Sequence, residues 1–149
     1  MDIKSAEDRS RNMSHIRSRD TSAEVYVRKL LFSRGFRYRI APKEIPGKPD
    51  LWFPGKQAAV FIHGCFWHRH EGCTLAYMPK SRVEFWQKKF DANVARDRVV
   101  RQQLSEQGIR CLVVWECMIR KMRKDPDLEK SVVDEMVRFL TGDTVFEEI

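Results

Sequence analysis

The stretch KPDLWFPGKQAAVFIHGC, residues 48–65, decides the fold. DLWF and AAVFIHG are short apolar runs of the kind that form buried strands, and the PGK turn between them predicts a β-hairpin. Pro49 would fix the entry to the first strand, so that Asp50 projects from the edge of the sheet. The hairpin would then bring the end of the second strand, at His63, beside Asp50.

Helices and further strands are predicted on both sides of this hairpin. Capping-box spacing at Thr21–Glu24 and at Ser81–Glu84 predicts the start of two helices, which Gly35 and Gly108 would end. The remaining predicted elements are a half-buried strand FRYRI (36–40), a buried strand IRCLVVW (109–115) and an amphipathic helix LEKSVVDEMVRFL (128–140). We therefore expect one α/β domain over residues 1–149, in which helices flank a central mixed sheet. Residues 1–19 would form a polar, basic N-terminal arm.

The composition narrows the class of protein. Lysine and arginine number 28 against 21 acidic residues, and this net charge of +7 predicts a polyanionic partner, nucleic acid before a membrane surface. The longest apolar runs have five residues, whereas a bilayer crossing needs about 20. The N-terminus has no apolar segment typical of a secretory signal peptide. We therefore expect a cytoplasmic protein whose cysteines are reduced.

Asp50 is the candidate ligand for a catalytic metal ion. A phosphodiesterase that uses Mg²⁺ needs hard oxygen ligands on a rigid element, and substrate phosphates and water complete the shell. The alternative for Asp50 is a solvated turn residue. Alternation along AVFIHG puts His63 on the same face as Phe61. An Asp beside a basic group on the next strand is the layout of the PD-(D/E)xK nucleases, although Phe61 and His63 replace their second acid and lysine.

Three cysteines and a histidine have a spacing typical of zinc ligands: Cys65, His70, Cys73 and Cys117. They can form one tetrahedral site if the strand before Cys117 pairs beside the hairpin. The spacing alone does not decide between His68 and His70, and free buried thiols are the alternative to a metal site. Cys111, in the middle of that strand, fits a small buried hydrophobic residue better than a ligand.

Aromatic residues occupy the same segment. Phe66 and Trp67 stand between the candidate ligands, and Trp86 lies on the apolar stripe of the predicted long helix. In a basic protein such rings suit insertion between DNA bases. The alternative is that all three rings pack in the core.

Seven motifs stand out in order along the chain, from about Ser10 to Met118: RNM, RDTSAE, PGKPDLWF, VFIHGCFWHRH, RVEFW, NVARDR and LVVWEC. Together they resemble the very short patch repair endonucleases, bacterial enzymes that nick DNA at thymine–guanine mismatches left by deamination of 5-methylcytosine. HGCFWH is the most specific of these motifs. The resemblance, with the layout above, implies a restriction-endonuclease-like fold.

The resemblance also implies roles for the candidate catalytic residues. Asp50 would bind Mg²⁺, which bridges to the scissile phosphate, and the backbone carbonyl group of Ile62 would assist. His68 would activate the attacking water, and His63 would lie near the phosphate or a metal-bound water. Glu24 would hydrogen-bond to a metal-bound water, in competition with its predicted place in a capping box.

A structural zinc ion and a set of DNA contacts are implied as well. The zinc ligands would be Cys65, His70, Cys73 and Cys117. The DNA-contacting residues would be Phe66, Trp67 and Trp86 from the major groove, Met13 from the minor groove, and Asn93 in NVARDR. This chain departs from the familiar pattern at two places. HEGC has two residues between His70 and Cys73 where one is usual, and Ile62 stands where threonine is common.

We therefore expect a Mg²⁺-dependent endonuclease that nicks one strand of duplex DNA next to a T:G mismatch and so initiates very short patch repair. The alternatives are a restriction-type endonuclease without mismatch preference and a non-catalytic, zinc-stabilised DNA-binding module. The expected protein is a cytoplasmic bacterial monomer that acts at the nucleoid, has no membrane association, and has mismatch-repair proteins as candidate partners.

Overall fold

The hairpin at one edge of the sheet follows the predicted course. In the computed structural model, which describes residues 21–149, β1 (Leu51–Phe53) and β2 (Ala58–His63) pair antiparallel. A short 3-10 turn, η1 (Pro54–Lys56), joins them. The side chain of Asp50, directly before β1, accepts a hydrogen bond from the N–H of Ile62 at the end of β2. The hairpin therefore places Asp50 beside the end of the neighbouring strand, as predicted.

Two parallel strands complete a mixed sheet of order β1-β2-β3-β4. β3 (Arg110–Trp115), the predicted buried strand, runs parallel to β2 and pairs His63 with Trp115. β4 (Phe146–Glu148) runs parallel to β3 and was not predicted, because FEE is short and mostly charged. The parallel pair puts the ends of β2 and β3 at the same edge, so the residues that follow each strand meet there.

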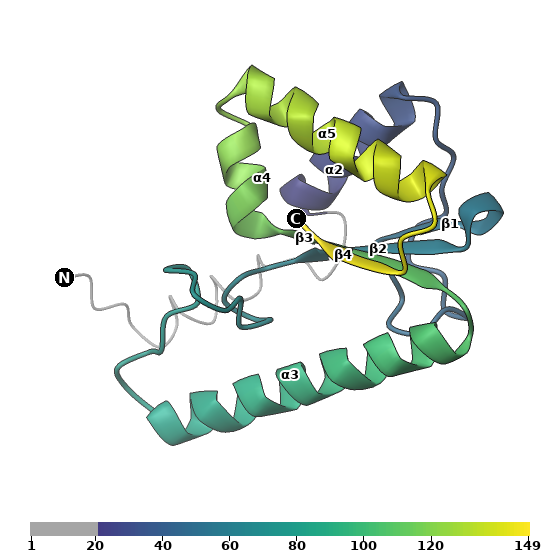
Figure 1. Ribbon diagram of the computed structural model, residues 1–149. Coiled ribbons are helices and arrows are strands. Elements are labelled where there is room, and N and C mark those ends of the chain that lie inside the picture. Colours follow the sequence, from purple (N-terminus) through teal and green to yellow (C-terminus); the bar gives the residue numbers. More distant parts are fainter. Residues whose placement is uncertain (1–20) are drawn as a thin grey trace.

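Helices cover both faces of the sheet (Figure 1). The helices α2 (Ser22–Ser33), α4 (Glu116–Met122) and α5 (Pro126–Thr141) lie on one face, and the long α3 (Val83–Glu106) lies on the other. Alternation along the strands supplies both cores, because neighbouring strand residues point to opposite faces. Leu112 and Val114 pack toward α2, α4 and α5, while Val113 packs on the side of α3. Residues 21–149 thus form a single α/β domain.

Three helix boundaries agree with the predicted ones. The Thr21 hydroxyl group caps α2 by accepting the N–H of Glu24 at 3.2 Å, and Gly35, in the left-handed region at φ 89°, follows the helix end. α5 ends at Thr141, next to the predicted end at Leu140, and Gly142 follows it.

Three local predictions were wrong. α3 begins at Val83 with Arg82 as its cap residue at φ 54°, so the predicted capping box at Ser81–Glu84 does not form. FRYRI (36–40) contributes only one bridge, between Arg39 and Trp52, because the chain turns away at Ala41 and β1 is only three residues long. α4 was missed, because its sequence ECMIRKM mixes charged and apolar residues in too short a run to show a helical period.

No helix in the described part of the chain combines the length and apolar character that a membrane crossing requires. The predicted N-terminal arm, residues 1–19, and with it Met13, lies outside the described residues.

Candidate active site and metal centre

Two clusters of metal-capable side chains interleave in the segment that leaves the end of β2. One cluster combines His63 and His68 with Asp97, which comes from α3. The other consists of Cys65, His70, Cys73 and Cys117. In each cluster the donor atoms lie within 4.8 Å of one another. The structure therefore separates the two histidines that sequence spacing could not tell apart.

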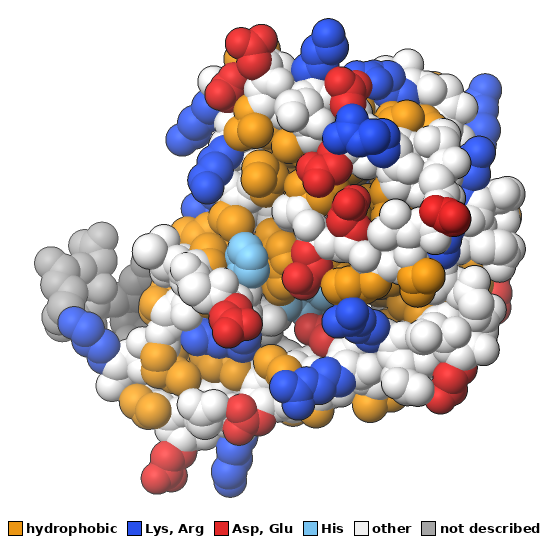
Figure 2. All heavy atoms as spheres, viewed as in Figure 1, with side chains coloured by type: hydrophobic (Ala, Val, Ile, Leu, Met, Phe, Trp, Pro, Cys, Tyr) orange, Lys and Arg blue, Asp and Glu red, His pale blue; other side chains and the backbone are white. Residues whose placement is uncertain are grey.

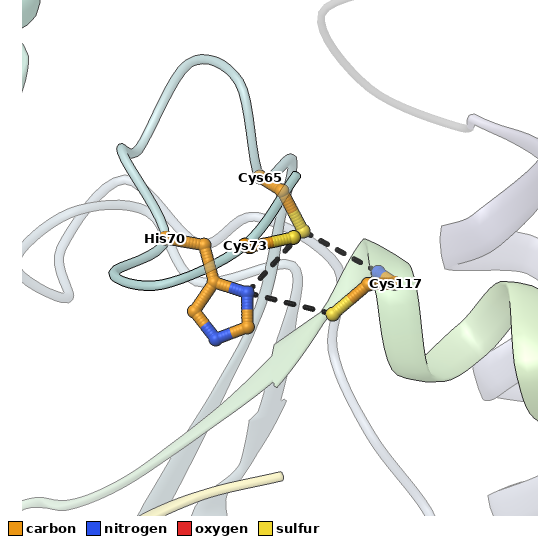
Figure 3. A group of neighbouring side chains, drawn as sticks. All are labelled: Cys65, His70, Cys73 and Cys117. Atoms are coloured by element: carbon orange, nitrogen blue, oxygen red, sulfur yellow. Dashed lines mark hydrogen bonds between the residues drawn. The ribbon is translucent and has the colours of Figure 1, made fainter. Parts of the chain in front are cut away.

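The cysteine cluster has the dimensions of a tetrahedral zinc site. The Nδ1 atom of His70 lies 3.5 Å from the Cys65 sulfur and 3.4 Å from the Cys117 sulfur. Zinc bond lengths place a nitrogen and a sulfur ligand roughly 3.6 Å apart in a tetrahedron. The four side chains point toward one another, three from the loop and Cys117 from the first turn of α4 (Figure 3). Gly72, at φ 71°, accommodates the additional residue of HEGC before Cys73.

Residues around the cysteine cluster contact its members and fix their positions. The ring of Trp115 stacks on His70 with centroids 4.1 Å apart and 6° between the planes. A carboxylate oxygen of Glu116 accepts the N–H of Cys65 at 3.3 Å, and the other binds Arg120 at 2.9 Å. Burial raises the pKa of the Cys65 thiol to about 12. A bound cation would replace that proton, because thiolate is the form that ligates metal.

The histidine cluster has a different geometry. The rings of His63 and His68 stack in parallel, 3.8 Å apart with 3° between planes, and Nδ1 of His68 lies 2.7 Å from an Asp97 carboxylate oxygen. A ring nitrogen binds metal in the plane of its ring, so two stacked rings do not direct their lone pairs at one ion. Burial, with a smaller contribution from the adjacent His68, lowers the pKa of His63 to about 3, although Asp97 opposes the shift. This arrangement suits proton transfer better than metal binding.

Asp97 was missed at the sequence level, because in NVARDR it resembles any charged residue of a solvated helix. Asn93 lies one turn earlier on the same face of α3, since residues four apart are neighbours. Its side-chain amide donates to the carbonyl oxygen of Trp67 at 3.1 Å. The signal that could have found Asp97 is this pairing of two polar residues at a spacing of four. α3 thus contacts the loop at both positions.

Asp50 and Glu24 form an acidic pair next to the histidines. The pKa of Asp50 is raised to about 7, chiefly by burial; the N–H of Ile62, at 2.6 Å, opposes the rise, and a hydrogen-bonded Glu24 carboxyl group contributes to it. His68 is close enough to Asp50 to lower its pKa electrostatically. The second oxygen of Glu24 lies 3.3 Å from Arg28. The N–H of Glu24 thus donates to the cap residue of α2, while its carboxyl group faces Asp50.

Comparison with known proteins identifies the family. Residues 1–75 match the family model of the DNA mismatch endonuclease Vsr. The chain is 37% identical over 142 residues to the DNA mismatch endonuclease Vsr of Escherichia coli (strain K12), which covers 95% of this chain and 89% of that protein. The chain belongs to the very short patch repair endonuclease family.

Two proteins named as nicking enzymes are also similar to this chain. The Type II nicking enzyme V.XorIIP of Xanthomonas oryzae is 46% identical over 70% of this chain and 76% of its own length. The Type II nicking enzyme V.NmeAIP of Neisseria meningitidis is 43% identical over 80% of this chain and 84% of its own length.

In this family member the aromatic residues form a cluster of their own. Phe66 stacks on Trp67 with centroids 5.2 Å apart and 9° between planes, and Trp86 lies 6.0 Å from Trp67. Phe90, one turn along α3, is buried beneath Phe66 at 5.0 Å. Phe66, Trp67 and Trp86 are only half-buried. The three rings thus rest on Phe90 and still present surface, which combines the two alternatives that the sequence left open.

The histidine side chains reach the surface near the middle of the face shown in Figure 2, with hydrophobic side chains beside them. Acidic side chains lie directly beside this region, and lysine and arginine side chains lie around it on the same face. The face therefore combines titratable, apolar and cationic groups.

Proposed function

We propose that this chain nicks one strand of double-stranded DNA beside a T:G mismatch, in a Mg²⁺-dependent hydrolysis that initiates very short patch repair. The observation that carries the proposal is the convergence of the Asp50–Glu24 pair and the His68–Asp97 pair at the end of β2. Its support includes relatives that are named as a DNA mismatch endonuclease and as nicking enzymes. A pure DNA-binding module would have no use for these four groups together.

His68 is the proposed general base. Its Nδ1 atom faces Asp97, so the neutral ring carries its proton there and leaves Nε2 free to accept a proton from water. Asp97 then stabilises the imidazolium that forms. A positioned base of this kind contributes about 10²–10⁴-fold to a rate.

His63 supports His68 from the other face of its ring. It is neutral because it is buried, and Phe61 and Trp115 contact it with centroids 5.8 and 5.2 Å away. A rigid neutral ring beneath His68 restricts its rotation, and the N–H of His63 can donate to a phosphate oxygen.

Asp50 and the carbonyl oxygen of Ile62 fit a Mg²⁺ site. A buried pair of carboxyl groups, one with a pKa near 7, requires a proton or a cation, and Mg²⁺ prefers oxygen ligands. The N–H of Ile62 already faces Asp50. Because a strand residue directs its N–H and C=O to the same side, the carbonyl group faces that side too. When bound, Mg²⁺ would stabilise negative charge on the phosphate oxygens.

The remaining parts of the proposal concern stability and placement. The cysteine cluster would hold a structural Zn²⁺ that fixes the loop between the histidines and the aromatic rings. Asp50 directly before β1, with His63 at the end of the adjacent β2, fits a restriction-endonuclease-like core. The half-buried rings, with Asn93 beside them, would enter the DNA from the major groove, and Met13 would enter from the minor groove. The protein would act as a monomer in the bacterial cytoplasm.

Two duplexes test the proposal, one fully matched and one with a single T:G pair, each incubated with Mg²⁺. We expect nicking of one strand of the T:G duplex alone. Absence of scission in both duplexes would refute a nuclease function. Equal nicking of both would favour the second candidate, a nicking enzyme without mismatch preference.

The Asp50→Ala variant tests the metal role. We expect nicking to be abolished and DNA binding to be kept, because Asp50 would hold the metal and not the duplex. Asp134→Ala is a matched control, since Asp134 is a partly exposed acid of α5 paired with Arg34. Full activity of the Asp50 variant would show that the metal does not bind there.

A further inference from the structure

Tyr77, in the irregular segment between the cysteine cluster and α3, is an exposed ring that the proposed function leaves without a role. Its exposed fraction is 61%, the largest of any aromatic residue in 21–149. Its hydroxyl group has no hydrogen-bond partner within those residues. Apolar surface that stays in water gains no hydrophobic stabilisation, and a group of exposed aromatic rings is typical of an interaction site.

The segment that carries Tyr77 is fixed in place by a single side chain. The Nη1 atom of Arg69 donates to the carbonyl oxygens of Tyr77 and Phe66, both at 3.1 Å, and Nη2 donates to Ala76 at 2.9 Å. The same guanidinium lies over Phe90 at 3.8 Å from its centroid. Arg69 therefore ties the Tyr77 segment to the backbone of Phe66 and to α3.

This anchoring seats the Tyr77 ring against the aromatic cluster. Its centroid lies 5.0 Å from that of Phe66, with 42° between the planes. The ring is thus exposed and pre-organised at the same time. Rigid tyrosine rings bind with little loss of side-chain entropy, because they have only two rotatable side-chain bonds.

Cationic groups surround these rings. The Lys89 ammonium lies 5.9 Å from the centroid of Trp67, and the Arg82 guanidinium lies 4.3 Å from that of Phe85. Aromatic platforms edged by cations bind nucleic acid by base stacking and phosphate attraction together. An apolar protein partner would not need the cations. The complementary partner is therefore a nucleic acid with an accessible base.

We infer that Tyr77 is a further base-stacking residue, which contacts a nucleotide next to the base step that Phe66 and Trp67 enter. The inference rests on the proposed function, because it needs DNA bound against the aromatic cluster. It extends the contacting surface from three rings to four.

The test measures equilibrium binding to a T:G duplex that carries 2-aminopurine beside the mismatch, with Ca²⁺ in place of Mg²⁺ to prevent nicking. We expect Tyr77→Ala to weaken binding about tenfold, because stacking of one base is lost. It should also reduce the rise in 2-aminopurine fluorescence that reports unstacking. Tyr77→Phe should stay within about twofold of the unchanged protein, because the ring is kept.

Phe32→Ala is the matched control, since Phe32 is an aromatic residue of α2 that is 51% exposed. It should leave both signals unchanged. Binding by Tyr77→Ala equal to that of the unchanged protein would overturn the inference, and so would a Tyr77→Phe variant as weak as Tyr77→Ala. If the unchanged protein shows no preference for the T:G duplex, the proposed function fails instead, and the two failures are thereby distinguished.

Discussion

The residues of the cysteine cluster and of the histidine cluster are interleaved between His63 and Cys73, yet the two clusters differ in how their donor atoms are directed. In the first, the Nδ1 atom of His70 faces two sulfur atoms at 3.5 and 3.4 Å, so donors converge on a point. In the second, His63 and His68 stack in parallel and one nitrogen is occupied by a carboxylate. The comparison teaches that donor direction, and not donor proximity, separates a metal site from a proton-transfer site.

A single residue produces this separation. Arg69, between His68 and His70, has a left-handed backbone at φ 53°. If Arg69 were extended or helical, the side chains of His68 and His70 would project in the directions set by a regular strand or helix. The left-handed turn instead sends one ring toward α3 and the other toward α4.

The largest expected effect comes from breaking the convergent cluster. His70→Ala should lower bound zinc from about one ion per chain to none and abolish nicking, because a structural site needs four ligands. Elemental analysis after chelator washing measures the zinc, and a strand-scission assay measures nicking. Cys111→Ala is the control, since Cys111 is buried outside the cluster and its loss should leave the zinc content unchanged. Full zinc in the His70 variant would contradict the assignment.

The next largest effect is expected from a variant of the histidine cluster that should change the nicking rate but not the zinc content. His68→Ala should lower the nicking rate about 10²–10⁴-fold, because the proposed general base is lost. Its zinc content should stay at that of the unchanged protein. Loss of zinc in this variant would mean that His68, and not His70, is the ligand.

Asp97→Asn should have a smaller effect. The amide keeps the shape of the side chain but removes the charge that stabilises protonated His68, so the rate should fall on the order of tenfold to a hundredfold. Single-turnover nicking measures the change. A loss as great as that of His68→Ala would indicate a more direct role for Asp97 in the reaction.

The smallest effect is expected at Trp115, which contacts a histidine of each cluster. Trp115 stacks on His70 and meets His63 edge-on. Trp115→Phe keeps a ring and removes an indole N–H that is buried without a partner in residues 21–149. The free energy of unfolding should therefore fall by less than about 1.5 kcal/mol, the value of one aromatic pair. Denaturant titration measures it, and a much larger loss would show that Trp115 sustains both clusters.

The sequence predicted the elements that have a strong local signal. The PGK turn, the apolar run of β3 and the cap at Thr21 each depend on neighbours in the chain, and all three are present. β4 and α4 carry no such signal, because each is short and stabilised by the sheet or by α5. The cap at Ser81 failed because a spacing of three residues does not by itself set the backbone angles of Arg82.

In the candidate site, too, only the residues with a local sequence signal could be predicted. Spacing was sufficient to group Cys65 with Cys73, and the strand order needed to bring in Cys117 could be anticipated from its apolar run. The roles of Asp97 and Trp115 could not, because each acts through a contact between distant segments; Asp97 lies 29 residues from His68. Such contacts arise from tertiary packing, which leaves no local pattern.

The parallel pairing of β2 and β3 also sets the order in which the protein can assemble as it folds. Cys65, His70 and Cys73 are close in sequence, whereas Cys117 lies 52 residues beyond Cys65 and arrives only after β3 has docked. Closing so long a loop is entropically costly and slow compared with local structure. A metal ion that binds before β3 docks would have three protein ligands and one open coordination position. A metal ion that binds afterwards would have all four ligands and would stabilise the sheet that has already formed.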